Sequence, residues 1–355
     1  MGERREEEMT VEKSEVFWHS PMNEPFHIAG FPWLEKDGVY RRMPVKPKHP
    51  LPPAVDDLAN CTAGGQIRFQ TNSSRLSVKV RLTGTADMNH MPATGQCGFD
   101  CYIGASGEQK YYNTTKYDHT KKEYEFAMFE KMDAGVQNMT LYFPLYMGVE
   151  EVLIGLDPEA EIAAPPPYSS DKRIVIYGTS ITQGGCAARP GMAYTNILSR
   201  KINLEFINLG FSGNGKGEAE VAHAISEIPN PQLFVLDYEA NSVSPELLES
   251  TLPEFIRIYR GKHPKVPIVV LSQIRYARET FDHGLLELRQ RRKSIQMNIV
   301  NKLRQQGDDK LYFCDGEQLL GDDYSECTVD GVHPTDLGFI RMAEHLAPVM
   351  MQYIG

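Results

Sequence analysis

The stretch RIVIYGTSITQGG, residues 173–185, decides the fold of the second half of the chain. Its opening, RIVIYG, is a short apolar run typical of a buried strand in a parallel sheet. Ser180 follows this predicted strand, between Gly178 and Gly184. A serine at such a strand-to-helix turn can point into the cleft above the sheet, where backbone N–H groups and the helix dipole favour negative charge. Because a hydroxyl is a weak nucleophile by itself, a catalytic role requires a base elsewhere.

Strand-like and helix-like segments alternate through the rest of this half. Such alternation predicts a doubly wound parallel sheet, whose functional sites form at the carboxyl ends of the strands. Apolar runs predict further strands at 204–210, 232–238, 266–274 and 311–316, and helical patterns occur at 192–202, 217–228, 244–262, 285–305 and 334–354.

A candidate base lies near the end of the chain, in VDGVHPTDLGF at 329–339. Asp330 and His333 are close neighbours in this segment, which follows the last predicted strand. An aspartate so placed can hold an imidazole in one tautomer, as in a Ser-His-Asp triad. His333 is therefore the candidate base for Ser180, and Asp330 is the group that orients it.

Two more residues follow predicted strands and can stabilise negative charge. Gly213 follows the second strand, and a glycine lets the backbone come close enough to a ligand for its N–H to donate to an oxyanion. Asn241 follows the third strand, and its side-chain amide can donate to the same oxyanion. Both are candidate oxyanion donors.

Each candidate also has an ordinary structural role open to it. A serine after a buried strand is often a helix N-cap. A glycine or asparagine in such a place is often a turn or cap residue. The Asp330/His333 pair could be a loop hydrogen bond ahead of a helix that Thr335 caps. Finding all of these residue types in order, each after its own strand, favours the catalytic interpretation.

The first half has a different pattern, and AAPPPYSS at 163–170 separates the two halves. Consecutive prolines disfavour helix and stiffen the chain, so this segment predicts a linker or domain edge. Before it, short runs such as 66–71 and 75–84 alternate apolar and polar residues with period two, as strands do. We predict a β-sandwich or jelly roll over 1–165 and an α/β domain over 170–355, and a chain of 355 residues fits two domains.

Composition narrows the class of protein. The chain is 41% hydrophobic and 24% charged, as soluble globular proteins are, and its net charge of -10 argues against nucleic acid or an anionic membrane as the main partner. The basic run Arg289–Arg292 is interpreted as the solvated face of a helix. The sequence offers no signal peptide and no spanning segment, so we expect a cytoplasmic protein with reduced cysteines. Cys97 and Cys101 could bind a metal, but no second pair supports them, and they are interpreted as strand residues.

The four blocks described above resemble those of the SGNH/GDSL hydrolase superfamily, over about 172–350. The resemblance implies a flavodoxin-like three-layer α/β/α fold, with no metal and no organic cofactor. It implies Ser180 as nucleophile, His333 as general base and then acid, and Asp330 as orienter. The implied oxyanion hole consists of the Ser180 N–H, Gly213 and Asn241.

The first half resembles the N-terminal β-sandwich of one branch of this superfamily, which carries a Gly-x-Asp-Leu-Tyr signature. Here it reads GFDCY, Gly98–Tyr102, with Cys101 in the leucine position. Similar two-domain proteins are carbohydrate or acetyl esterases. The catalytic half departs from the usual pattern twice. Thr179 replaces the aspartate of Gly-Asp-Ser, and DYEANS replaces Gly-x-Asn-Asp, so that Tyr238 and Glu239 are expected to alter the pocket.

The sequence thus predicts a cytoplasmic serine esterase that removes small acyl groups, in particular acetyl, from sugars or oligosaccharides. The β domain is expected to shape the acceptor side of the cleft, where Tyr102 and Trp33 either stack on sugar faces or belong to the core. Three alternatives stay open: a lysophospholipase or thioesterase, a carbohydrate-binding protein without turnover, and a β domain that serves homo-oligomer contacts. The position of Cys186, in the cleft or packed beside it, is also open.

Overall fold

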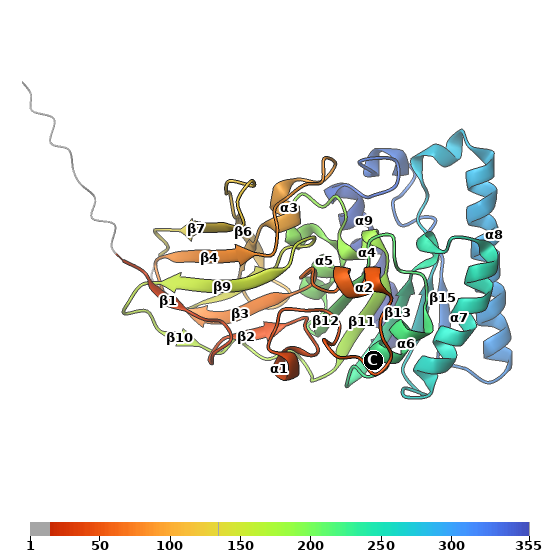
Figure 1. Ribbon diagram of the computed structural model, residues 1–355, viewed down its shortest axis with the longest axis horizontal. Helices are drawn as coiled ribbons and strands as arrows, with labels where there is room; N and C mark the ends of the chain where they lie inside the picture. The colour runs from red at the N-terminus through yellow and green to blue at the C-terminus, as the bar shows by residue number, and fades with distance from the viewer. Residues whose placement is uncertain (1–14, 134, 355) are drawn as a thin grey trace, which may run out of the picture.

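A computed structural model describes residues 15–133 and 135–354. The described chain forms a parallel sheet in its second half and two antiparallel sheets in its first half (Figure 1). The antiparallel sheets lie at one end of the long axis of the molecule. Helices α7 (Pro245–Arg260) and α8 (His283–Gln305) lie at the other end.

The parallel sheet has the strand order β12-β11-β13-β14-β15. The chain enters at β11, places β12 on one side and then adds the remaining strands on the other. This is the doubly wound order of flavodoxin-like folds, which bind ligands where the order reverses, and it confirms the predicted fold class. The strands are β11 (Arg173–Gly178), β12 (Glu205–Gly210), β13 (Pro231–Asp237), β14 (Ile268–Leu271) and β15 (Leu311–Cys314).

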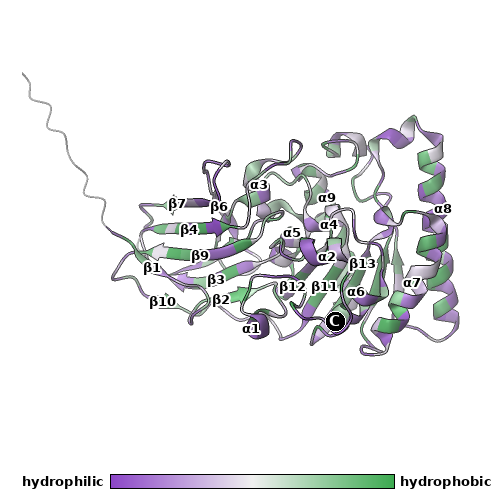
Figure 2. Cartoon of the chain, in the orientation of Figure 1, coloured by the Kyte–Doolittle hydropathy of each residue, from purple (hydrophilic) through white to green (hydrophobic). Residues whose placement is uncertain are grey.

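Helices cover both faces of this sheet because side chains alternate along each strand. In β11, Ile174 and Ile176 join a core cluster with α5 and α9, whereas Val175 and Tyr177 join a second cluster with α6, α7 and α8. Figure 2 shows hydrophobic residues concentrated in the central strands. No helix in the described ranges combines the length and the apolar character needed to cross a membrane. The remaining helices of this half are α4 (Ser180–Gln183), η1 (Pro190–Met192), α5 (Tyr194–Lys201), α6 (Ala219–Ile225), η2 (Glu239–Asn241), η3 (Ala277–Thr280), η4 (Tyr324–Cys327) and α9 (Asp336–Ile354).

The basic run on α8 corrects one prediction. Arg289 and Arg292 are only 2% and 8% exposed, so these two arginines do not belong to a solvated helix face, whereas Arg291 between them is exposed. The Arg289 guanidinium forms an ion pair with Glu279 of η3, with Nε and Oε2 2.7 Å apart. The pattern of α8 alone could not reveal this, because the covering segment η3 lies outside the helix.

The two antiparallel sheets pack face to face around a shared apolar core. One sheet has the order β1-β9-β4-β7, and the other has the order β10-β3-β8-β5-β6 with β2 beside β3. Alternate side chains of β3 and β4 point into this core, as the period-two pattern predicted. The elements are β1 (Phe17–His19), β2 (His27–Ala29), α1 (Leu34–Asp37), α2 (Pro53–Leu58), β3 (Gln66–Thr71), β4 (Leu76–Leu82), α3 (Ala93–Cys97), β5 (Asp100–Ile103), β6 (Lys110–Thr114), β7 (Glu123–Phe129), β8 (Gln137–Tyr142), β9 (Val149–Leu156) and β10 (Ile162–Ala163).

The paired cysteines of this half are core residues. Cys101 lies in β5, as expected, but Cys97 ends the short helix α3 and is not a strand residue. Pro92 precedes α3, where its fixed φ is compatible with a helix start. Both thiols are fully buried in the sandwich core, and the cysteines of the described chain are free.

The two halves share core residues. Val55 of α2 packs into the cluster on the α6–α8 face of the parallel sheet, and Leu145 packs into the cluster on the α5/α9 face. The buried guanidinium of Arg42 donates to the carbonyl oxygen of Gly210, at the carboxyl end of β12, over 2.5 Å. Loops of the first half therefore reach the edge of the sheet where sites are expected.

Candidate active site

The turn after β11 presents Ser180 at the first position of α4. Thr179 is the N-cap: its Oγ1 accepts from the Ile181 N–H, and its own N–H donates to Thr182 Oγ1, both over 3.3 Å. The threonine that replaces the usual aspartate therefore holds the turn. The alternative that Ser180 is the cap is wrong, and its hydroxyl is available for another partner.

That partner is His333, which arrives from the loop before α9. Ser180 Oγ lies 2.8 Å from His333 Nε2, and His333 Nδ1 lies 2.7 Å from Asp330 Oδ2. The other oxygen of Asp330 accepts the backbone N–H groups of Val332 (3.0 Å) and His333 (2.8 Å). The structure thus brings together the three residues that the sequence proposed as nucleophile, base and orienter.

The charge state of Asp330 follows from these contacts. Burial by itself would raise the pKa of its carboxyl group, but the hydrogen bonds from the backbone and ring of His333 outweigh burial and lower the pKa to about 2. An ionised acceptor at Nδ1 favours the tautomer that carries its proton there. The lone pair of Nε2 then faces Ser180, as base catalysis requires. Thr335 Oγ1 also accepts from the Gly338 N–H over 3.3 Å, so the loop does cap a helix as well.

Ser180 and His333 line a cavity of about 270 Å³, together with Gly213 and Asn241. Gly213 has a φ of +68°, a left-handed conformation that favours glycine, so it is also a turn residue. Asn241 Oδ1 accepts the Gly215 N–H over 3.3 Å, which leaves the amide NH2 group for the cavity. Asn241 does not cap α7, because Ser244 does so by accepting the Leu247 N–H. The other lining residues are Thr179, Ile181, Ser212, Ala240, Tyr276 and Val332.

Tyr238 and Glu239, expected to alter the pocket, are buried behind it and are not among its lining residues. The Tyr238 hydroxyl lies 3.1 Å from that of Thr251 on α7. Glu239 Oε2 accepts the Gln273 N–H over 2.9 Å. Burial raises the pKa of Glu239 to about 7, although this hydrogen bond and the charge of Arg292 oppose the shift. Through these contacts Tyr238 and Glu239 anchor the loop that carries Asn241 to α7 and to the segment after β14.

Two contacts from the first half reach the nucleophile turn. The Tyr146 hydroxyl donates to the carbonyl oxygen of Ser180 over 3.2 Å, and Gln183 Nε2 donates to the carbonyl oxygen of Leu145 over 3.1 Å. Leu145 and Tyr146 were not predictable as site residues, because FPLYMG at 143–148 has the composition of a β-rich stretch. The loop that connects β8 and β9 contains both residues, and its position between two strands is the sequence feature that could have indicated a contact outside the sandwich.

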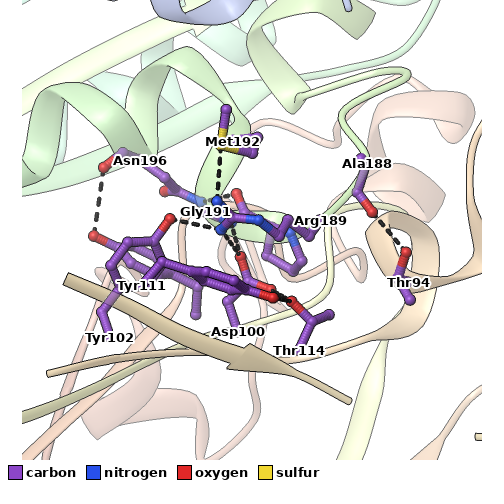
Figure 3. A network of polar contacts seen from close by, with 12 residues as sticks. Thr94, Asp100, Tyr102, Tyr111, Thr114, Ala188, Arg189, Gly191, Met192 and Asn196 are labelled. Carbon is purple, nitrogen blue, oxygen red and sulfur yellow. Dashed lines mark hydrogen bonds and ion pairs between the residues drawn. The ribbon is translucent and has the colours of Figure 1, made fainter. Parts of the chain in front are cut away.

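Figure 3 shows a second polar network, centred on Asp100 of the GFDCY stretch. The Asp100 carboxylate accepts from Arg189 Nη1 (2.8 Å), the Gly191 N–H (2.7 Å) and Thr114 Oγ1 (2.6 Å). Arg189 Nη1 also donates to the hydroxyl oxygen of Tyr102 over 2.6 Å. This network joins the β-sandwich to the loop that follows α4.

The aromatic residues considered for sugar stacking have other positions. Tyr102 is 3% exposed and packs in the Figure 3 network, so the stacking hypothesis is wrong for it and the core alternative holds. Trp33 packs against the core cluster on the α6–α8 face. Cys186 is 4% exposed, and burial together with the charge of Asp330 raises the pKa of its thiol to about 12. It packs beside the catalytic loop and does not line the cavity.

A hydroxyl, an imidazole and a carboxylate in hydrogen-bonded series, at the carboxyl edge of a doubly wound sheet, define the site of an acyl hydrolase. Comparison with known proteins agrees with this class. The model of the GDSL-like lipase/acylhydrolase family matches residues 171–351, and the model of the N-terminus of SGNH-hydrolase-type esterases, labelled GxDLY, matches residues 16–162. The chain belongs to the GDSL-like lipase/acylhydrolase family.

Solved structures extend the likeness to the whole chain. A protein from Bacteroides ovatus described as a GDSL-like lipase is 31% identical, with a TM-score of 0.88 over 96% of this chain and 98% of its own. The salicylyl-acyltransferase SsfX3 of a tetracycline biosynthetic pathway is 20% identical, with a TM-score of 0.76 over 95% and 97%. A family two carbohydrate esterase from Cellvibrio japonicus is 14% identical, with a TM-score of 0.60 over 96% and 98%. The search of curated proteins found no match.

Proposed function

We propose that this acylhydrolase removes O-acetyl groups from carbohydrates and that Ser180, His333 and Asp330 are its catalytic triad. The observation that carries the proposal is the hydrogen-bonded series from Ser180 Oγ through both ring nitrogens of His333 to Asp330. It begins at the wall of a small cavity. No other acid or base needs to move for the first step.

In the proposed reaction, Ser180 Oγ attacks the ester carbonyl while His333 Nε2 takes its proton. The imidazolium that forms is stabilised by the ionised Asp330. Collapse of the tetrahedral intermediate breaks the ester bond, and His333 returns the proton to the leaving sugar hydroxyl. Water, activated by the same histidine, then attacks the acyl-enzyme and releases acetate and free Ser180.

The negative charge of the tetrahedral intermediate needs donors that are already in place. Asn241 offers its amide NH2 group, whose orientation the Gly215 N–H fixes through Oδ1. Gly213 offers its backbone N–H from the same cavity wall, and the Ser180 N–H belongs to the first turn of α4. We assign the oxyanion hole to these three groups.

Cavity size supports a small acyl group. The space beside Ser180 measures about 270 Å³, and its apolar lining comes mainly from Ile181, Tyr276 and Val332. A long fatty acyl chain would require a longer apolar groove, as the lysophospholipase alternative supposes. Similarity in fold to family two carbohydrate esterases supports a carbohydrate as the alcohol part of the ester substrate. One of these esterases, from Clostridium thermocellum, was solved in complex with cellohexaose.

The test uses p-nitrophenyl acetate, butyrate and octanoate with wild-type protein and Ser180→Ala. We expect acetate to be the best substrate and the mutation to lower turnover by at least about 10⁴-fold. Ser250→Ala, at an exposed position of α7, is the matched control and should retain the wild-type activity. Preference for octanoate would overturn the acetyl assignment, and equal activity of Ser180→Ala and wild type would overturn the triad.

Substrate class needs a second measurement, release of acetate from acetylated oligosaccharides. Release that depends on Ser180 supports carbohydrate deacetylation. Saccharide binding without release would instead support the alternative of a binding protein. Transfer of acetyl to an added alcohol would indicate an acyltransferase, the activity named for the structural neighbour SsfX3.

A further inference from the structure

Four side chains beside the nucleophile converge in a way that the esterase mechanism does not require. His90 comes from a loop of the first half, Cys186 from the segment after α4, and Asp330 and His333 from the catalytic loop. One potential metal-ligand atom from each residue lies within 4.8 Å of all the others. Around a tetrahedral zinc ion, with metal–ligand distances of about 2.0–2.3 Å, ligand atoms lie about 3.3–3.8 Å apart. The largest separation therefore exceeds the ligand spacing of a zinc site by about 1.0–1.5 Å, which is the adjustment that binding one ion requires.

The ligand types select the metal. A thiolate and two imidazoles suit zinc, whereas magnesium and calcium prefer six or more oxygen ligands. The one carboxylate completes four ligands, the usual number for zinc. The rings of His90 and His333 lie with their centroids 5.9 Å apart, so the second imidazole already faces the catalytic one.

The backbone at Cys186 is a second, independent observation. Its φ is +74°, in the left-handed region that is unfavourable for a residue with a Cβ. Such strain persists only where the surroundings impose it, and it concentrates at functional sites. The segment is held on its far side, where the Ala188 carbonyl accepts from Thr94 Oγ1 over 2.6 Å and Arg189 binds Asp100. The strained turn thus keeps the thiol beside Asp330.

We propose that His90, Cys186, Asp330 and His333 form a zinc site whose occupation inhibits the esterase. A zinc ion at Nε2 of His333 would take the lone pair that must accept the Ser180 proton. An ion at Nδ1 would displace the Asp330 contact that orients the ring. Binding releases the thiol proton of Cys186 to solvent and transfers no electron. The ion would also join the two halves across the active site, because His90 belongs to the first half.

The binding part of the proposal is tested without any activity. Ser180→Ala protein is titrated with zinc in competition with a chromophoric chelator. Cobalt is then used as the probe for a thiolate-to-metal charge-transfer band. We expect one ion per chain, and adding Cys186→Ser or His90→Ala should weaken binding by at least about tenfold, since even outer-shell partners are worth that much. The charge-transfer band should vanish in Cys186→Ser.

Matched controls remove other histidines and cysteines. His223 stacks on His49 with ring centroids 4.2 Å apart, the other close histidine pair in the described chain, and Cys61 is a free thiol that does not belong to the four-residue group. His223→Ala and Cys61→Ser should bind zinc as the parent does. Zinc binding that survives both Cys186→Ser and His90→Ala, or that His223→Ala abolishes, overturns the proposal.

The inhibitory part rests on the proposed function and is measured on the active protein. Micromolar zinc should suppress p-nitrophenyl acetate hydrolysis, magnesium at the same concentration should not, and a chelator should restore it. Each variant is compared with its own metal-free rate, and half-inhibition should need at least about tenfold more zinc in Cys186→Ser and His90→Ala. Zinc binding without inhibition would overturn the inhibitory role. An absence of esterase activity would contradict the proposed function but leave the binding result intact.

Discussion

Two carboxylates of this protein sit at the centre of hydrogen-bond networks, and they differ in what surrounds them. The Asp330 side chain is 35% exposed and serves a histidine that opens onto a cavity. The Asp100 side chain is 0% exposed and has an arginine, a backbone N–H and a hydroxyl as partners. The first network ends at the Ser180 hydroxyl in the cavity wall, whereas the partners of Asp100 do not extend that network to the cavity.

The difference in exposure and partners between Asp330 and Asp100 separates a structural network from one that can take part in catalysis. A buried carboxylate whose two oxygens both accept from fixed partners holds an arrangement of the chain, here the contact between the sandwich and the second half. A network that reaches an accessible cavity can exchange a proton with a substrate. The two stretches that carry them, VDGVH and GFDCY, both place an aspartate beside glycine and apolar residues, but only VDGVH adds a histidine three residues after the aspartate.

The largest expected effect is that of Asp330→Asn. It removes the ionised acceptor at Nδ1, so the histidine should adopt the wrong tautomer and turnover should fall by about 10⁴-fold, with a loss of stability smaller than that caused by Asp100→Ala. Initial rates with p-nitrophenyl acetate and a thermal melt measure both. Asp322→Asn, an exposed acid of the same segment, is the control and should behave as wild type. A loss of less than tenfold would mean that Asp330 only shapes its loop.

Asp100→Ala should show the opposite profile. Truncating one partner of a buried ion pair leaves Arg189 without its charge partner, which typically costs about 3–5 kcal/mol of unfolding free energy. Urea denaturation followed by circular dichroism measures it, and turnover of the folded protein should change far less than in Asp330→Asn. Asp118→Ala, which removes a surface pair with Lys121, should change stability by less than about 0.5 kcal/mol. An unchanged denaturation midpoint for Asp100→Ala would erase the contrast between the two networks.

Asn241→Ala tests whether the open network includes an oxyanion donor. Losing one donor typically lowers kcat by about 10²–10³-fold, because the interaction forms fully only with the tetrahedral intermediate. KM for the acetate ester should change little. Asn301→Ala, at an exposed position of α8, is the matched control and should retain the wild-type kcat. A change confined to KM would assign Asn241 to substrate binding instead.

The smallest expected effect concerns a third carboxylate, Asp237, at the end of β13. Its enclosure raises its pKa to about 6, although hydrogen bonds from Thr182 and Tyr194, each 2.8 Å, oppose the shift. The folded protein therefore holds this proton more tightly than the unfolded chain, so its contribution to stability is present below about pH 4 and is lost as pH rises through about 6. Asp237→Asn should flatten the dependence of the melting temperature on pH over that range. An unchanged slope would show that the shift is absent.

Much of the architecture was predictable. Period-two alternation located β3 and β4, and short apolar runs separated by helical patterns located the strands of the parallel sheet. These patterns are strong because a strand that is buried on one face needs an apolar residue at every second position, and a strand that is buried on both faces needs one at nearly every position. The burial of Arg289 was not predictable in this way, since it depends on η3, a segment outside α8.

The sequence by itself determined the order of the chemistry: a serine, a glycine, an asparagine and an Asp-x-x-His pair, each after its own strand. Parallel strands present their carboxyl ends at one edge, so that order implies proximity. Only the tertiary structure decided that Thr179 caps α4 and leaves Ser180 free, that Tyr146 supports the nucleophile turn, and that His90 and Cys186 face the catalytic pair. These contacts join loops, whose paths follow from packing between distant segments and not from any local period.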